Sequence, residues 1–169
     1  MSKTIVTSVL GALFIEGKIL LVKRRDIPVW TIPGGGIEPF ETAEEAIIRE
    51  IKEETGVNAL IDRKVALYTS SSPFIKPVYL FSLSPKGPLS FHPQNSEVKK
   101  MGIFSKDDLP HVTAPFQVDW IKDAFENKPY FEKHITTITP FYAFKVFMKH
   151  PIIGIKFLLM QSKMRVKNK

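Results

Sequence analysis

Three glutamates near the middle of the chain have a spacing that suits metal binding. Glu50, Glu53 and Glu54 stand at positions i, i+3 and i+4, so on a helix that turns about 100° per residue they share one face. Ala46 and Ile47 lie on the same face one turn earlier, and we therefore expect this face to pack inward. Carboxylates clustered on a half-buried face repel each other unless a cation lies between them. Mg²⁺ or Mn²⁺, which prefer hard oxygen ligands, are the expected cofactors.

The same spacing also suits a solvent-exposed helix whose acids only add solubility. The sequence before the helix favours the metal interpretation, because Gly34, Gly35 and Gly36 follow one another in "PGGG". A glycine backbone can approach a ligand closely and can take positive φ angles. A flexible backbone beside clustered carboxylates is suited to phosphate chemistry.

These residues carry a family resemblance. Gly35 is followed after five residues by Glu41, and Glu41 is followed after seven residues by the run "REIKEETGV" from Arg49 to Val57. Together these residues resemble the complete signature of the Nudix hydrolases. The resemblance extends over residues 3 to about 127. It implies an α+β fold in which a mixed β-sheet lies between helices (an α/β/α sandwich), with the signature forming a loop, a helix and a second loop. It also implies hydrolysis of a nucleoside diphosphate linked to another group.

The resemblance assigns roles residue by residue. Glu50, Glu53 and Glu54 would bind the divalent metals, and Arg49 would orient a neighbouring carboxylate. Glu41 would brace the loop, and the glycines would shape the turn at the substrate. A water-derived proton would pass to Glu53 or to Glu97, which precedes a later strand. An exposed loop acid is the alternative interpretation of Glu97.

Substrate contacts are predicted on both sides of the signature, at Lys23, Arg24, Arg25, Gly34, Gly35 and Gly36. The three basic residues would contact phosphate or a sugar acid, and a solvated strand end is the alternative. Gly56 is predicted to be structural, like Glu41. Phe40 stands where many relatives have glycine, so the turn tolerates a side chain, or Phe40 covers the site or packs on the tail.

The substrate is less well indicated than the reaction. Pro73 resembles a proline of ADP-ribose-cleaving relatives, although the acidic residues that usually follow are missing. The motifs of the RNA-decapping and NADH-cleaving branches are absent from the sequence. A small nucleotide conjugate such as ADP-ribose is favoured, with dinucleoside polyphosphates and nucleoside triphosphates as alternatives. A non-catalytic module that senses nucleotide conjugates is the alternative from another functional class, but it would not need all three metal glutamates.

The elements that must position these residues can be predicted from local patterns. Residues 4–15 and 18–24 are predicted to be strands of a hairpin joined at Glu16 and Gly17, in preference to a signal sequence. Thr42 with Glu45 predicts a capped helix start, and Gly56 predicts its end. Further strands are predicted at residues 30–32, 57–70, 76–84 and 98–105, and a helix at 118–127.

The chain divides into a domain over residues 1–139 and a basic, apolar helical extension over residues 140–169. The extension holds seven Lys and Arg and no acid, which equals the whole-chain net charge of +7. As a helix it would place five lysines on one stripe, typical of a segment that lies on an anionic membrane surface. Packing on the domain or on a second subunit of a homodimer is the alternative. No specific nucleic acid is expected as a partner.

Composition excludes other classes. The chain has no cysteine, so it cannot use a thiol nucleophile, a disulfide framework or a cysteine zinc site. No stretch reaches the roughly 20 apolar residues of a membrane span. We expect a cytoplasmic protein, with attachment at the membrane periphery as an option that depends on the extension.

Overall fold

The computed structural model of the chain describes residues 5–71, 76–94 and 96–136. The predicted extension at 140–169 and Pro73 lie outside the described residues. The elements, in chain order, are β1 (Ser8–Ile15), β2 (Lys18–Arg24), β3 (Trp30–Thr31), β4 (Gly34–Gly36), α1 (Ala43–Thr55), β5 (Ala59–Ser70), β6 (Val78–Pro85), β7 (Val98–Phe104), α2 (Pro115–Phe125) and β8 (Phe131–Ile135).

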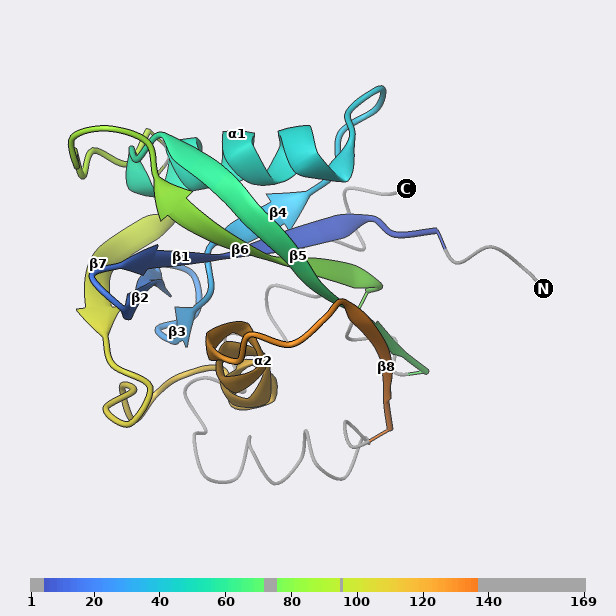
Figure 1. The fold of residues 1–169 in the computed structure, drawn as a ribbon. Helices are drawn as coiled ribbons and strands as arrows, with labels where there is room; N and C mark the ends of the chain where they lie inside the picture. Colours follow the sequence, from blue (N-terminus) through green and yellow to red (C-terminus); the bar gives the residue numbers. More distant parts are fainter. Residues whose placement is uncertain (1–4, 72–75, 95, 137–169) are drawn as a thin grey trace.

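The strands form one mixed sheet with a helix on each face (Figure 1). The order across the sheet is β3-β2-β1-β6-β5-β8, with β4 paired to β1 and β7 paired to β2. The β1–β6 and β5–β8 pairs are parallel and the other pairs are antiparallel. This arrangement confirms the predicted α+β sandwich.

The hairpin of β1 and β2 forms as predicted. Glu16 and Gly17 both have positive φ angles, 50° and 75°, which are the angles of a two-residue turn that matches the twist of the strands. The first strand was predicted from residue 4, but β1 begins only at Ser8. Pro77, which precedes the neighbouring strand β6, accepts a hydrogen bond from the Thr7 N–H. Because proline has no N–H of its own, it cannot continue the ladder of hydrogen bonds between the two strands.

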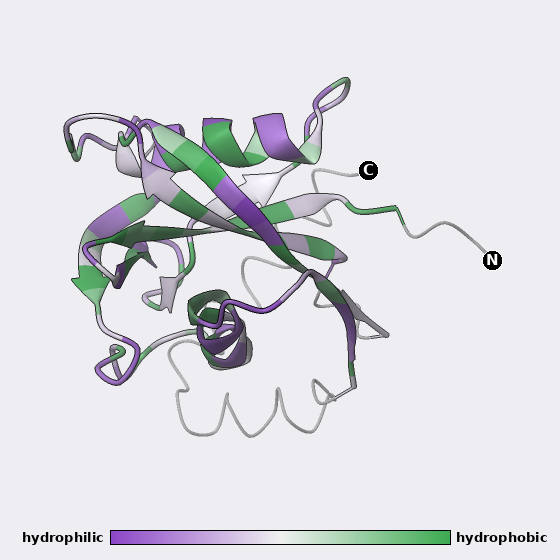
Figure 2. Ribbon diagram, in the orientation of Figure 1, coloured by the Kyte–Doolittle hydropathy of each residue, from purple (hydrophilic) through white to green (hydrophobic). Residues whose placement is uncertain are grey.

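Two apolar layers hold the helices to the sheet. Beneath α1 the sheet packs against Ala46, Ile47 and Ile51, which are fully buried. On the opposite face Tyr68 stacks on Trp120 of α2, with ring centroids 4.7 Å apart. Hydrophilic and hydrophobic segments alternate along α1 (Figure 2), and its buried residues include Glu54 and Thr55 beside the apolar Ala46, Ile47 and Ile51.

Helix α1 has both predicted ends. The Thr42 hydroxyl accepts a hydrogen bond from the Glu45 N–H, and the Glu45 carboxylate accepts one from the Thr42 N–H. Gly56 ends the helix in the left-handed conformation at φ 79°. The second helix was predicted at 118–127, but it begins earlier, at Pro115, because proline suits the first helical turn.

Candidate active site

Two glutamates of α1, Glu50 and Glu54, lie directly against Gly34, Gly35 and Gly36, which are called the glycine turn below. The Glu54 carboxylate accepts a hydrogen bond of 2.9 Å from the Gly34 N–H. A Cβ atom placed on Gly35 would lie 2.3 Å from Oε1 of Glu50. A side chain at position 35 would therefore displace the Glu50 carboxylate from its present place. The turn and the helix thus bring Glu50 and Glu54 together at one place.

The glycine turn is itself part of the sheet. Gly34, Gly35 and Gly36 form β4, which pairs with Leu10, Val9 and Ser8 of β1. The sequence predicted a flexible turn at these glycines, and that was wrong for their secondary structure. The pairing fixes the turn to the central strand, so that Glu50 and Glu54 face a rigid backbone.

Arg49 connects the helix to the loop before it. Its guanidinium donates to both carboxylate oxygens of Glu41, at 2.8 and 3.0 Å, and to the Gly36 carbonyl oxygen at 2.9 Å. It also donates to Oε1 of Glu50 at 2.9 Å, and its Nη1 lies 3.6 Å from Oε1 of Glu53. Arg49 therefore contacts the carboxylates of both Glu41 and Glu50, and its role in the reaction stays a prediction.

Burial dominates the electrostatics of the pair. Glu54 is 5% exposed, and this burial raises its pKa to about 7, with contributions from the charges of Glu50 and Glu97. The Gly34 hydrogen bond and the charge of Arg24 act in the opposite direction but are weaker. Burial also raises the pKa of Glu50, against the hydrogen bond from Arg49. Both carboxylates are therefore costly to ionise without a further cation.

The carboxylate oxygens at the glycine turn suit a hard divalent cation. Among the described residues, no group of three His, Cys, Asp or Glu side chains stands close enough together to hold a metal ion. The carboxylates of Glu50 and Glu54 nevertheless both lie at the glycine turn, where burial raises the pKa of each and the charge of Glu50 further raises that of Glu54. Glu53 lies beside them on the outer part of the helix, with its side chain 39% exposed. Oxygen donors of this kind fit Mg²⁺ or Mn²⁺.

Glu97 acts electrostatically on the same pair of carboxylates. It precedes β7, and its charge raises the pKa of both Glu50 and Glu54. Its Oε2 lies 4.0 Å from Nη2 of Arg24. The charge of Glu97 thus reaches the carboxylates of the signature helix, and its catalytic role stays a prediction.

The three basic residues at the end of β2 have different surroundings. Lys23 lies 5.8 Å from the ring centroid of Trp30. Arg24 forms two hydrogen bonds with the Asp26 carboxylate, at 2.9 and 2.7 Å. Arg25 donates to the backbone carbonyls of Ser96 and Val98. Their contact with substrate remains a prediction.

The segment before Glu97 rests on the end of α1, which the sequence analysis did not foresee. The Gln94 N–H donates to the Glu53 carbonyl oxygen at 2.7 Å. A Cβ atom on Gly56 would lie 2.4 Å from the backbone nitrogen of His92. Gly56 thus ends the helix and also leaves room for this segment to cross it. The only sequence signal for this second function is the glycine itself.

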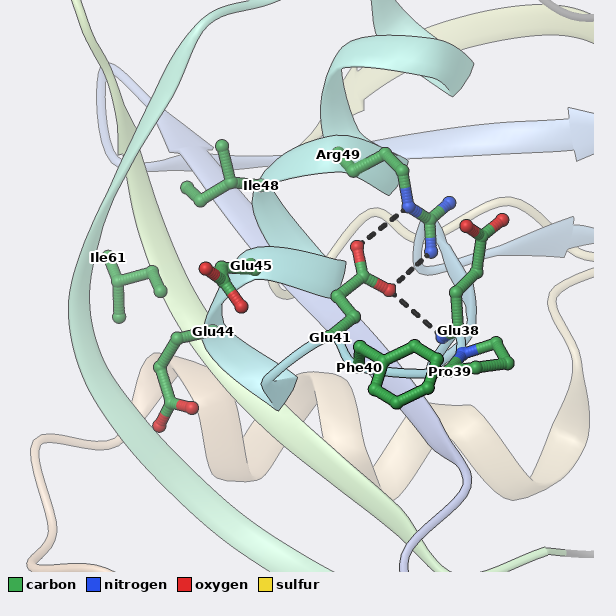
Figure 3. A pocket seen from close by; sticks show the side chains of 9 residues that line it. All are labelled: Glu38, Pro39, Phe40, Glu41, Glu44, Glu45, Ile48, Arg49 and Ile61. Atoms are coloured by element: carbon green, nitrogen blue, oxygen red, sulfur yellow. Dashed lines mark hydrogen bonds and ion pairs between the residues drawn. The ribbon is translucent and has the colours of Figure 1, made fainter.

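Phe40 lies in the loop that leads into α1, beside a shallow depression of about 710 Å³. Pro39 and Phe40 lie on one side, Ile48 and Ile61 lie on the other, and Arg49 reaches Glu41 across it (Figure 3). The Phe40 ring is fully exposed and its φ is 69°. The turn therefore accommodates a side chain at position 40, and the two other predictions for Phe40 stay predictions, since residues 140–169 lie outside the described residues.

Comparison with known proteins identifies the family. A model of the NUDIX domain matches residues 5–124, which is more than half of the chain. The chain therefore belongs to the Nudix hydrolase family, as the resemblance predicted.

No helix within the described part of the chain is long and apolar enough to cross a membrane.

Individual relatives are named for different substrates. A protein of Bacillus subtilis (strain 168) named "Putative 8-oxo-dGTP diphosphatase" is 57% identical over 51 residues, covering 30% of this chain and 34% of the relative. An ADP-ribose pyrophosphatase of Methanocaldococcus jannaschii is 45% identical over 58 residues, covering 32% and 34%. The chain thus matches about a third of the length of each of these two relatives.

A solved structure matches over a larger share. The crystal structure of an ADP-ribose pyrophosphatase from Streptococcus suis 89-1591 superposes with a TM-score of 0.64 at 27% identity. The match covers 75% of this chain and 97% of that one. The shared fold therefore includes nearly all of the related enzyme.

Proposed function

We propose that this chain is a divalent-metal-dependent pyrophosphohydrolase that cleaves a phosphoric anhydride bond of a nucleoside diphosphate linked to another group. The observation that carries the proposal is the placement of Glu50 and Glu54, desolvated and side by side, against the backbone of the glycine turn. Nudix hydrolases generally use divalent metal ions. A buried pair of acids without enough countercharge is suited to an incoming cation and its diphosphate.

Each residue has a part in this chemistry. Glu50, Glu53 and Glu54 would hold Mg²⁺ or Mn²⁺, which when bound neutralises diphosphate charge and acidifies a bound water. Arg49 keeps Glu50 and Glu41 in place through three hydrogen bonds and donates a fourth to the Gly36 carbonyl oxygen. Gly34, Gly35 and Gly36 give the diphosphate a close approach to the backbone.

The proton released on attack needs a carboxylate acceptor. Glu53 and Glu97 are the two candidates, because both lie at the edge of the acidic pair and are more exposed than Glu54, with side-chain exposures of 39% and 64%. A solvent-exposed carboxylate can accept a proton and pass it on to water. Glu54, which is buried, is better suited to holding the cation.

ADP-ribose-like conjugates are the leading substrate class. The names of the Methanocaldococcus relative and of the Streptococcus structure support this choice. A nucleoside triphosphate is the second candidate, and the name of the Bacillus relative, with the highest of these identities, favours it. A non-catalytic sensor is disfavoured, because the chain keeps the complete set of glutamates together with the arginine that orients them.

A panel of substrates tests the proposal. ADP-ribose, dinucleoside polyphosphates, dGTP and 8-oxo-dGTP are incubated with Mg²⁺ or Mn²⁺, and the products are identified by mass spectrometry. Glu53→Gln should lower kcat by at least about 100-fold while ligand binding is retained. Glu44→Gln, on the same helix but paired with Lys64 at 2.8 Å, is the matched control and should turn over like the wild type. Unchanged turnover in Glu53→Gln would refute the role of Glu53, and no product from any substrate would refute the proposal.

A further inference from the structure

Arg25 donates hydrogen bonds to the backbone carbonyl oxygens of three successive residues, Ser96, Glu97 and Val98. The Arg25 side chain donates from Nε to the Ser96 carbonyl oxygen at 2.8 Å and from Nη2 to that of Val98 at 3.3 Å. The Arg25 backbone N–H donates to the carbonyl oxygen of Glu97 itself, at 2.8 Å. The backbone on both sides of Glu97 is therefore fixed by Arg25.

The strand pairing explains why this segment needs an anchor. In the β2–β7 ladder Lys23 pairs with Lys100, but Arg24 pairs with Val98, so Lys99 is an extra residue. Such a bulge interrupts the ladder and redirects the chain beyond it. The segment before β7 would thus leave the sheet immediately after an irregularity, and Arg25 supplies the hydrogen bonds that a regular ladder would have made.

Glu97 is placed between opposite charges. Arg24 lies 4.0 Å from its carboxylate and is itself held by two hydrogen bonds from its guanidinium to Asp26. The charge of Glu97 also acts on Glu50 and Glu54. The Glu97 side chain is 64% exposed, so packing does little to orient it. The hydrogen bonds from Arg25 fix the backbone from which this side chain starts.

We propose that Arg25 is a positioning residue of the active site, which holds the backbone of Ser96, Glu97 and Val98 so that the Glu97 carboxylate faces Glu50 and Glu54. This inference rests on the proposed hydrolase function. It gives Arg25 a different role from the substrate contact predicted from the sequence. Guanidinium suits the role because its planar fork reaches two carbonyls at once, whereas the single ammonium of lysine does not offer two fixed N–H directions.

A double-mutant cycle separates positioning from direct substrate contact. Arg25→Ala should lower kcat by at least about tenfold, because small misplacements of a catalytic group have effects of this size. KM should change by less than about threefold, since substrate binding does not depend on Glu97 in this proposal. In a Glu97→Gln background the same Arg25→Ala change should alter kcat by less than about twofold, because the two residues act as one unit. Arg25→Lys should recover only part of the loss.

Arg63 offers a matched control. It also donates to backbone carbonyls, those of Lys128, Ala124 and Glu126, but next to α2 and β8. Arg63→Ala should cost stability without lowering kcat. If Arg63→Ala and Arg25→Ala lowered kcat equally, the effect of Arg25 would be general destabilisation and the positioning role would be overturned.

Hydrogen exchange tests the anchor without any turnover. In the metal-free protein, Arg25→Ala should speed amide exchange in the peptides covering residue 25 and residues 96–98 by at least about tenfold, whereas Arg63→Ala should not. Unchanged exchange would overturn the inference. Three kinetic results would also overturn it. The first is that Arg25→Ala changes mainly KM, and the second is that Arg25→Ala lowers kcat as much in the Glu97→Gln background as in the wild type. The third is that Glu97→Gln itself leaves kcat unchanged. None of these outcomes would refute the hydrolase function, which fails only if the wild type cleaves no substrate of the panel.

Discussion

The buried carboxylate of Glu54 accepts its hydrogen bond from the backbone N–H of Gly34, at 2.9 Å. This contact joins the signature helix to the strand formed by the glycine turn. It satisfies one oxygen of a side chain that is 5% exposed, but one hydrogen bond does not compensate for the lost hydration of a full negative charge. In the metal-free protein the negative charge of Glu54 therefore lowers the free energy of unfolding, and this effect can be measured.

The first consequence concerns pH. Because burial raises the folded-state pKa of Glu54 from 4.5 to about 7, its stabilising contribution is fully present below pH 4.5 and is lost as the pH rises through 7. The metal-free wild type should lose about 3 kcal/mol of unfolding free energy over this range relative to Glu54→Gln. The glutamine keeps an acceptor for the Gly34 N–H but carries no charge. Urea unfolding in EDTA at several pH values measures the difference, and parallel pH profiles of the two proteins would contradict it.

Added metal should reverse this loss. At pH 8 Mg²⁺ or Mn²⁺ should raise the melting temperature of the wild type more than that of Glu54→Gln, because a cation that binds only the folded state stabilises it by mass action. Differential scanning calorimetry with and without the metal provides the measurement. Equal shifts of the two proteins would show that the cation binds elsewhere.

The glycine turn supplies a prediction with its own neighbouring control. Gly35→Ala should destabilise the protein by about 1–3 kcal/mol, because its Cβ would lie 2.3 Å from Oε1 of Glu50 and the carboxylate would have to move. Gly36→Ala should leave stability nearly unchanged, since the nearest atom to its Cβ, the Thr7 oxygen, is 4.0 Å away. Thermal unfolding of both variants checks this, and equal melting temperatures would contradict it.

Arg49 and Glu41 should be strongly coupled. Their two hydrogen bonds, at 2.8 and 3.0 Å, join side chains that are only 25% and 14% exposed. A double-mutant cycle on unfolding free energy should give a coupling of about 1–3 kcal/mol. The pair of Lys64 and Glu44, at 2.8 Å but 34% and 50% exposed, should give less than about 1 kcal/mol. Similar coupling energies for both pairs would contradict a special role for Arg49 in holding the loop.

The sequence predicted those parts of the site that depend on local chemistry. The capping box of Thr42, the stop at Gly56 and the shared face of Glu50 and Glu54 follow from neighbours within one or two turns, and the structure confirms them. The strand at Gly34–Gly36 was missed, because glycines have low strand propensity and only the distant β1 makes them a strand.

The contacts that sequence reasoning missed all join segments far apart in the chain. Strand β8 forms only by parallel pairing with β5, more than sixty residues earlier in the chain. The close approach of the His92 backbone to Gly56 and the hydrogen bond from the Arg25 side chain to the Ser96 carbonyl oxygen likewise depend on tertiary structure. A single sequence holds no periodicity that would reveal such pairs.

Phe40 provides the last prediction. It holds a left-handed conformation, φ 69°, although it is not glycine, and its ring is fully exposed. Such a conformation costs a side-chain-bearing residue roughly 1–2 kcal/mol, and the exposed ring recovers none of this by packing against the described residues. Phe40→Gly should therefore be more stable than Phe40→Ala by about 1 kcal/mol, because alanine keeps the steric cost whereas glycine removes it. Denaturant unfolding of the two variants, which differ by a single methyl group, measures the conformational term directly. If alanine proved as stable as glycine, the loop would have relaxed to a negative φ, and the strain would belong to the phenylalanine side chain instead of the turn.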